Sequence, residues 1–170
     1  MVVKRQGIIL GIDPGYVKTG YGIVEVYKDG EEKERYRLIS CGTIRLDNLS
    51  CSAKLFKLEQ TLLALVKVYR PTIGMVEDVF MAHNPQTIIK LGKILGVIQC
   101  TLGKHMEIYS YSPLAVRKII TSSGRATKIE SLARILEILD PTSVVISGLD
   151  TSDAIAIALS YALKAPEQPD

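Results

Sequence analysis

The order of strand-like and helix-like segments is the feature that most constrains the fold. Three strand-like segments come first, and the polar turn 29–34 joins the second to the third, which predicts an antiparallel meander. Helical apolar spacing then alternates with short apolar runs. The predicted strands are 7–12, 21–27, 36–46, 72–76 and 107–111, and the predicted helices are 53–69, 85–102, 113–120, 128–139 and 151–163. This order predicts an α/β protein with a mixed five-stranded sheet flanked by helices, the arrangement of the ribonuclease H-like fold.

The length of 170 residues leaves room for one domain of ordinary size. We expect a single domain over residues 1–164 and a frayed tail over 165–170. The longest nearly apolar stretch, 154–163, is well short of the roughly 18 residues that a membrane span needs. The N-terminus does not have the pattern of a secretory signal, and the three cysteines form no Cys-x-x-Cys motif. These features favour a reduced, cytoplasmic protein.

The small net charge of +3 conceals an uneven distribution. Residues 79–129 hold seven basic residues and one acid, Glu107, so this segment carries +6. The rest of the chain holds 14 basic and 17 acidic residues and carries −3. A basic segment on an acidic body suggests a surface that binds a polyanion, although a solvated surface that lacks acids would read the same way.

The predicted helix 85–102 has more apolar surface than one packing face needs. Its apolar residues and glycines cover well over half of the circumference. Gly92 and Gly96 form Gly-x-x-x-Gly, a pattern that lets another backbone approach closely and costs roughly 1 kcal/mol per glycine in helix propensity. The surplus surface predicts packing either inside the chain or against a second subunit, and the candidate interface residues are Ile88, Gly92, Leu95 and Gly96.

Two acids follow strands that read as central in the sheet. Asp13 follows the run Ile-Ile-Leu-Gly-Ile, and Glu77 follows Thr-Ile-Gly-Met-Val. Buried carboxylates are costly unless they are paired or bind a cation. Each acid also has a plain structural explanation, because Asp13 can belong to an Asp-Pro-Gly turn and Glu77 can pair with a nearby lysine.

A second pair of acids, Asp150 and Asp153, lies at the start of the last predicted helix. Their i, i+3 spacing places both carboxylates on one side of the helix, where they can also serve as an N-cap and an N3 acid. Four converging carboxylates would repel one another without a cation. Oxygen ligands of this kind suit Mg²⁺ or Mn²⁺, and two such ions about 3.5–4 Å apart support in-line hydrolysis of a phosphodiester.

Four sequence blocks that cover nearly half of the chain resemble the RuvC-type Holliday junction resolvases: GIDPGYVKTGYGIVE, VEDVFMAHNPQTIIKLGKILGVI, YSPLAVRKIITSSGRATK and DTSDAIAIALSYA. The resemblance implies a bacterial endonuclease that nicks four-way DNA junctions symmetrically and leaves 5′-phosphates. It implies catalytic, metal-binding roles for Asp13, Glu77, Asp150 and Asp153, with Mg²⁺ as the cofactor, Mn²⁺ as a substitute and two ions expected per site.

The same resemblance implies DNA contacts outside the acids. Phe80 matches an aromatic residue that stacks on a base near the junction centre, and its alternative role is that of a core residue. Arg117, Lys118 and Lys128 match basic residues that contact phosphates, and Arg125 belongs to the same cluster. The implied partners are a second copy of the chain, bound through helix 85–102, and the RuvA–RuvB branch-migration complex.

The chain also departs from the family pattern. Tyr16 stands where the family usually has Ser or Thr, and Asp78 adds a second acid beside Glu77. Strand alternation sends Glu77 and Asp78 to opposite faces, so one of them is expected at the site. Residues 141–148 are apolar where the family often has a Pro- and Asp-rich run, and they could form an extra buried turn.

Three other functions remain open at this level. An actin-like phosphotransferase would share the Asp-Pro-Gly loop, but it needs a second lobe for which the chain has no room. A junction-binding protein without cleavage would bind tightly and make no nicks with Mg²⁺. A related ribonuclease H-like nuclease would act on another nucleic acid.

Overall fold

The structure is a computed structural model that describes residues 7–78, 84–143, 146 and 149–164, with the backbone alone for 149 and 150. Its strands are β1 (Gly7–Asp13), β2 (Lys18–Lys28), β3 (Glu34–Arg45), β4 (Ile73–Glu77) and β5 (Glu107–Tyr111). Its helices are α1 (Cys51–Tyr69), α2 (Pro85–Leu102), α3 (Pro113–Thr121), α4 (Lys128–Ile138) and α5 (Leu149–Leu163). This order confirms the predicted sequence of elements.

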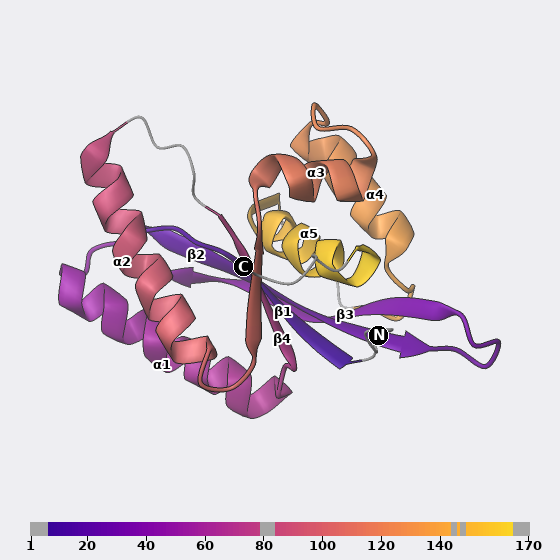
Figure 1. Ribbon diagram of the computed structural model, residues 1–170, viewed down its shortest axis with the longest axis horizontal. Helices are drawn as coiled ribbons and strands as arrows, with labels where there is room; N and C mark the ends of the chain where they lie inside the picture. Colours follow the sequence, from indigo (N-terminus) through magenta and orange to yellow (C-terminus); the bar gives the residue numbers. More distant parts are fainter. Residues whose placement is uncertain (1–6, 79–83, 144–145, 147–148, 165–170) are drawn as a thin grey trace.

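The five strands form one mixed sheet in the order β3-β2-β1-β4-β5. The meander β1–β2–β3 is antiparallel, and β4 and β5 continue the sheet in parallel from β1. Helices α1 and α2 lie on one face of the sheet, and α3, α4 and α5 lie on the other (Figure 1). The predicted ribonuclease H-like architecture is confirmed.

Alternation along β1 divides the core into two clusters. Ile9 packs with residues of α5, whereas Leu10 and Ile12 pack with residues of α1 and α2. Helix α5 is buried along most of its length because it lies between the sheet and the helices α3 and α4. A helix enclosed in this way is apolar all round, which explains why the sequence of α5 shows no polar face.

Two paired glycines bring α5 into direct contact with the sheet. Gly11 of β1 pairs with Gly22 of β2. A Cβ at Gly11 would lie 2.3 Å from the carbonyl oxygen of Ala154, and a Cβ at Gly22 would lie 3.0 Å from the Cα of Ile155. Side chains at both positions would therefore lift the start of α5 off the sheet, next to the end of β1.

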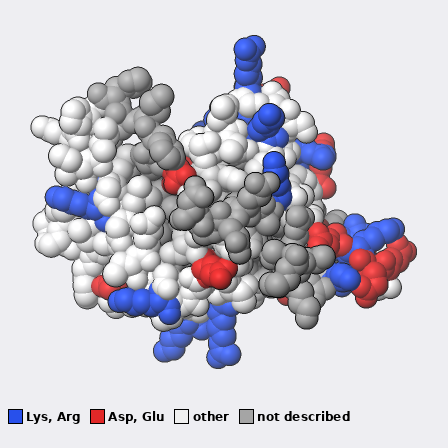
Figure 2. All heavy atoms as spheres, viewed as in Figure 1, with Lys and Arg blue, Asp and Glu red and all other residues white. Residues whose placement is uncertain are grey.

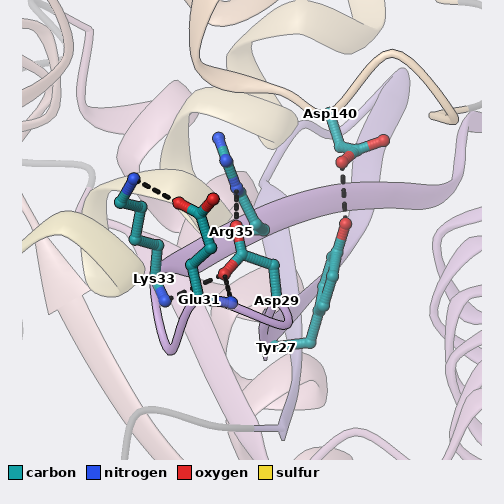
Figure 3. Close-up of polar contacts among 6 residues, drawn as sticks. All are labelled: Tyr27, Asp29, Glu31, Lys33, Arg35 and Asp140. Atoms are coloured by element: carbon teal, nitrogen blue, oxygen red, sulfur yellow. Dashed lines mark hydrogen bonds and ion pairs between the residues drawn. The ribbon is translucent and has the colours of Figure 1, made fainter.

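The hairpin between β2 and β3 carries the polar contacts drawn in Figure 3. Asp29 accepts hydrogen bonds from the backbone N–H groups of Glu31 and Lys33 and from Nε of Arg35. At the base of the hairpin, the Tyr27 hydroxyl donates to Asp140 Oδ2 at 2.7 Å. The hairpin thereby contacts the chain that leaves α4.

Two helices begin two residues earlier than the sequence predicts. Ser50 caps α1 by accepting from the N–H of Ala53, so the helix begins at Cys51 rather than at the expected residue 53. Helix α5 begins at Leu149, two residues earlier than expected, which places Asp150 inside its first turn. Residues 141–143 of the predicted buried turn 141–148 do form a turn, but Pro141 and Thr142 are exposed, so this part of the prediction is wrong; Ile146 packs against the core, and the others lie outside the described residues. In the part of the chain that the structure describes, no helix combines the length and apolarity needed to cross a membrane.

Candidate active site

Asp13 and Glu77 end two neighbouring parallel strands. The pairing of β1 with β4 runs from Ile9–Ile73 to Ile12–Val76, so the next residues along the two strands are Asp13 and Glu77. On the same face as Asp13 lie Ile9 and Gly11, and on the same face as Glu77 lie Ile73 and Met75. This is the face covered by α5, since Ile9, Ile73 and Met75 pack with α5 and Gly11 contacts its backbone.

Asp78 points away from this face. Its Oδ2 accepts a hydrogen bond from the Ser110 hydroxyl at 2.9 Å, and its backbone N–H donates to the carbonyl of Tyr111. Asp78 is therefore tied to β5, and Glu77 is the acid that shares a face with Asp13. The expectation that one of the two acids faces the site is met by Glu77.

Asp153 reaches the same region from α5. It directly precedes Ala154, whose backbone lies on Gly11, and its side chain is half-buried. Asp150 lies one turn earlier in the backbone of α5, and its side chain is outside the described residues. The helix thus begins above the ends of the strands, with its N-terminal dipole directed toward the acids.

The electrostatics of Glu77 show that these acids influence one another. Burial of its carboxyl group raises the pKa of Glu77 to about 7, and the negative charges of Asp13 and Asp153 add to that rise. Arg117 and Lys128 act in the opposite direction and lower the pKa. Three acids from β1, β4 and α5 therefore interact at one place, with two cations beside them.

The predicted basic residues differ in where they lie. Lys128 forms an ion pair with Asp153, with Nζ 2.5 Å from Oδ2, and Arg117 is half-buried on α3 close enough to influence Glu77. Lys118 is exposed on α3. Arg125 lines a pocket of about 410 Å³ beside α4, together with Arg134 and two acids. Figure 2 shows basic side chains gathered over α3 and α4, and an acid exposed in the hollow between these helices and α2.

The predicted base-stacking residue, Phe80, lies outside the described residues. The described chain stops at Asp78, directly after Glu77, and resumes at Asn84, whose side chain caps α2 by accepting from the N–H of Gln86. Phe80 therefore follows the end of β4 in the sequence, and its role in base stacking stays a prediction.

The sequence interpretation missed residues that shape the loop after Asp13. Lys54 is 7% exposed, and its Nζ donates to the carbonyls of Leu46 and Tyr16. The ring of Tyr16 lies 4.8 Å from the Lys54 ammonium and 5.4 Å from that of Lys90. One signal was available, because Lys54 stands in the same helical stripe as the buried Leu58 and Leu62.

Gly11 and Gly22 were also missed. A glycine inside a strand often marks a place where another backbone approaches closely. Both glycines interrupt otherwise apolar strand sequences, which was the available signal.

The donor set of the site suits a hard divalent cation, because its members are carboxylates that repel one another. Among the described side chains, no group of three His, Cys, Asp or Glu residues lies close enough together to hold a metal ion. Asp150 is not among these side chains. The four-carboxylate metal site therefore stays a prediction, supported by the mutual repulsion of Asp13, Glu77 and Asp153.

The outer surface of α2 carries three of the four predicted interface residues, Ile88, Gly92 and Gly96. Ile88 is 52% exposed, and no atom of the described residues lies within 4 Å of where a Cβ would stand on Gly92 or Gly96. Leu95 is half-buried against the core between α1 and α2. The described part of the chain therefore gives the two glycines no internal packing partner.

Comparison with known proteins identifies the family of the chain. The family model described as crossover junction endodeoxyribonuclease RuvC matches residues 9–161. The crossover junction endodeoxyribonuclease RuvC of Caldicellulosiruptor saccharolyticus is 35% identical over 157 residues, which cover 91% of this chain and 92% of that protein.

Solved structures share the fold. The Thermus thermophilus RuvC structure matches with a TM-score of 0.79 and 25% identity, covering 93% of this chain and 95% of that one. T. thermophilus RuvC in complex with a Holliday junction substrate matches with a TM-score of 0.78 and 23% identity, covering 93% and 94% of the two chains. On the family model and the identity with its relatives, the chain belongs to the RuvC family of crossover junction endodeoxyribonucleases.

Proposed function

We propose that the chain resolves four-way DNA junctions in recombination and repair by paired, symmetric nicks, hydrolysing phosphodiester bonds and leaving 5′-phosphates. One observation carries the proposal. Asp13 and Glu77 end adjacent parallel strands on the face that α5 covers, and they interact electrostatically with Asp153 at the start of that helix. Membership of the RuvC family supports the junction as substrate.

The four acids have distinct places in this proposal. Asp13 and Glu77 present carboxylates from the rigid sheet, and Asp150 and Asp153 present theirs from the helix above it. Two Mg²⁺ ions, or Mn²⁺ in their place, would supply activation of the attacking water and stabilisation of the leaving 3′-oxygen. With a pKa of about 7, the Glu77 carboxyl group is partly protonated near neutral pH, so it would have to lose its proton to hold a cation.

Basic side chains hold the DNA backbone around the acids. Arg117 and Lys128 lie beside the acidic cluster, whereas Lys118 and Arg125 are exposed farther out. In this proposal the four bind phosphates, and Phe80 stacks on a base near the junction centre. The complex of T. thermophilus RuvC with a Holliday junction substrate, which has the same fold, supports a four-way junction as the DNA that is bound.

Two nicks at one junction call for two active sites, and each chain supplies one. The exposed Ile88 and the unfilled positions at Gly92 and Gly96 support a two-fold dimer through α2, in which the partner's helix approaches the glycines closely. In the bacterial cytoplasm, such a dimer would act with the RuvA–RuvB branch-migration complex.

Incubation with a synthetic four-way junction and Mg²⁺ tests the proposed function. We expect two nicks at symmetric positions on strands of like polarity, each religatable because it carries a 5′-phosphate, and no nicks in linear duplex of the same sequence. Tight junction binding without nicks would favour a non-cleaving protein. Equal cleavage of the linear duplex would favour a nuclease with another substrate.

A further inference from the structure

Lys128 occupies a position that helix stability does not explain. It is the first residue of α4, directly after the cap Thr127, and a positive charge at a helix N-terminus opposes the helix dipole. The capping box is complete without it, because Thr127 and Glu130 satisfy each other's backbone N–H groups. The placement of a lysine here therefore has another reason.

The ion pair with Asp153 supplies that reason. The Lys128 ammonium lies 2.5 Å from Asp153 Oδ2, and it connects the start of α4 with the start of α5. The Lys128 side chain is 57% exposed and that of Asp153 is 35% exposed, so the pair faces solvent. Exposed pairs of this kind contribute little, typically about 0.2–1 kcal/mol, and they exchange partners readily.

A divalent cation at the acids would compete with this lysine. Asp153 Oδ2 accepts a hydrogen bond from the Lys128 ammonium. A metal ion bound to the same carboxylate would repel this ammonium, as two cations about 4 Å apart do. A side chain as long and flexible as lysine can move its charge by several ångströms into solvent. The nearest polyanion available to it there is the phosphate backbone of the bound DNA.

We propose that Lys128 exchanges partners, pairing with Asp153 when no metal is bound and with a DNA phosphate when metal holds Asp153. This inference rests on the proposed function, because it requires the acids to bind a cation and the surface to bind DNA. The consequence is coupling. Metal binding raises the affinity for DNA, and DNA binding raises the affinity for metal by the same factor, because the two equilibria are linked thermodynamically.

The first test measures metal binding without DNA or cleavage. Mn²⁺ is titrated calorimetrically into the wild-type protein, Lys128→Met and Lys118→Met. Loss of the competing ammonium should make Lys128→Met bind Mn²⁺ about two- to five-fold more tightly, the range expected from an exposed ion pair. Lys118→Met removes an equal charge from an exposed position on α3 and should change the Mn²⁺ affinity less than about two-fold.

The second test measures how junction binding depends on salt, by fluorescence anisotropy in EDTA and in Ca²⁺, with the DNA recovered afterwards to verify that it is intact. Ca²⁺ should make the plot of log binding constant against log salt concentration steeper for the wild-type protein than for Lys128→Met. The extra steepening should correspond to about one phosphate contact. In Lys118→Met, the slope should be shallower than in the wild-type protein by the same amount in EDTA and in Ca²⁺.

The outcomes separate the inference from the proposed function. Equal Mn²⁺ affinity in the wild-type protein and Lys128→Met would overturn the exchange, and junction cleavage by the wild-type protein would still support the proposed function. An identical response of both proteins to Ca²⁺ in the salt titration would overturn the exchange as well. Failure of the wild-type protein to bind Mn²⁺ at all would overturn both the metal site and the exchange.

Discussion

At the scale of single residues, Asp140 fastens the chain that leaves α4. Its carboxylate accepts hydrogen bonds from the Thr142 hydroxyl, the Thr142 backbone N–H and the Tyr27 hydroxyl, and its own N–H donates to the carbonyl of Tyr36. The hydrogen bonds to its carboxylate, those from Thr142 first, lower the pKa of Asp140 to about 2. The charged form of Asp140 is therefore favoured in the folded protein.

This shift predicts a pH-dependent contribution to stability. The folded pKa lies below the unfolded value of about 3.9, so the contribution is present above about pH 4 and is lost as the pH falls through 2. Asp140→Asn should therefore be less stable than the wild-type protein near pH 7, and the difference should shrink between about pH 4 and pH 2. Urea unfolding of both proteins across this range measures it, and a difference that stays constant would contradict the assignment.

The acids at strand ends could be predicted from the sequence because a carboxylate after a buried apolar run is costly. Strand alternation indicates that only one of Glu77 and Asp78 faces the site. It does not say which one, because it does not show which face of the sheet α5 covers. The helical stripe that Lys54 shares with Leu58 and Leu62 indicated its burial, but its partners, the carbonyls of Leu46 and Tyr16, could not be predicted because they depend on how the chain folds back onto α1.

At the scale of secondary-structure elements, the close contact of α5 with β1 and β2 determines where Asp153 lies. The order of the elements could be predicted from apolar periodicity, and the ends of helices less well, since the start of α1 depends on its cap, Ser50. The glycine within β1 indicates that another backbone approaches closely at Gly11, but which helix supplies that backbone could not be predicted, because it depends on which helix covers which face.

Gly11→Ala tests that contact. The added Cβ would lie 2.3 Å from the carbonyl oxygen of Ala154 and 2.6 Å from the N of Ala158, so α5 must shift. We expect a loss of about 1–3 kcal/mol in the free energy of unfolding, with slower junction cleavage because Asp153 moves with the helix. Gly30→Ala is the matched control, since no described atom lies within 4 Å of its added Cβ. Wild-type stability in Gly11→Ala would show that α5 does not rest on this glycine.

At the scale of the whole molecule, the basic side chains proposed to bind DNA and the proposed dimer surface lie on opposite faces of the sheet. Basic side chains gather over α3 and α4 beside the acids, and the unpacked surface of α2 lies on the other side of the sheet (Figures 1 and 2). The basic segment and the surplus apolar arc of α2 could both be predicted from the sequence. The partner that covers the apolar arc of α2 could not be predicted from the pattern of residues, because an exposed apolar surface does not identify what packs against it.

Gly92→Glu tests the proposed dimer. A buried, unpaired charge at a close helix contact should disrupt association, so light scattering should report a monomer where the wild-type protein is a dimer. The helical content should stay unchanged, because Gly92 is exposed in the single chain. Gly30→Glu introduces the same charge at the tip of the hairpin and should remain dimeric. A stable dimer of Gly92→Glu would place the interface elsewhere.

The proposed chemistry depends above all on Glu77, and not its neighbour Asp78, belonging to the acidic site that cleaves the junction. Glu77→Gln and Asp78→Asn can be compared for binding and cleavage of one synthetic four-way junction in Mg²⁺. Glu77→Gln should bind the junction like the wild-type protein and lose cleavage by at least about 100-fold, the scale expected when a group that supports the reaction is removed. Asp78→Asn, whose side chain contacts Ser110 on the other face, should cleave within a few-fold of wild type. Normal cleavage by Glu77→Gln would remove Glu77 from the active site and contradict the proposed chemistry.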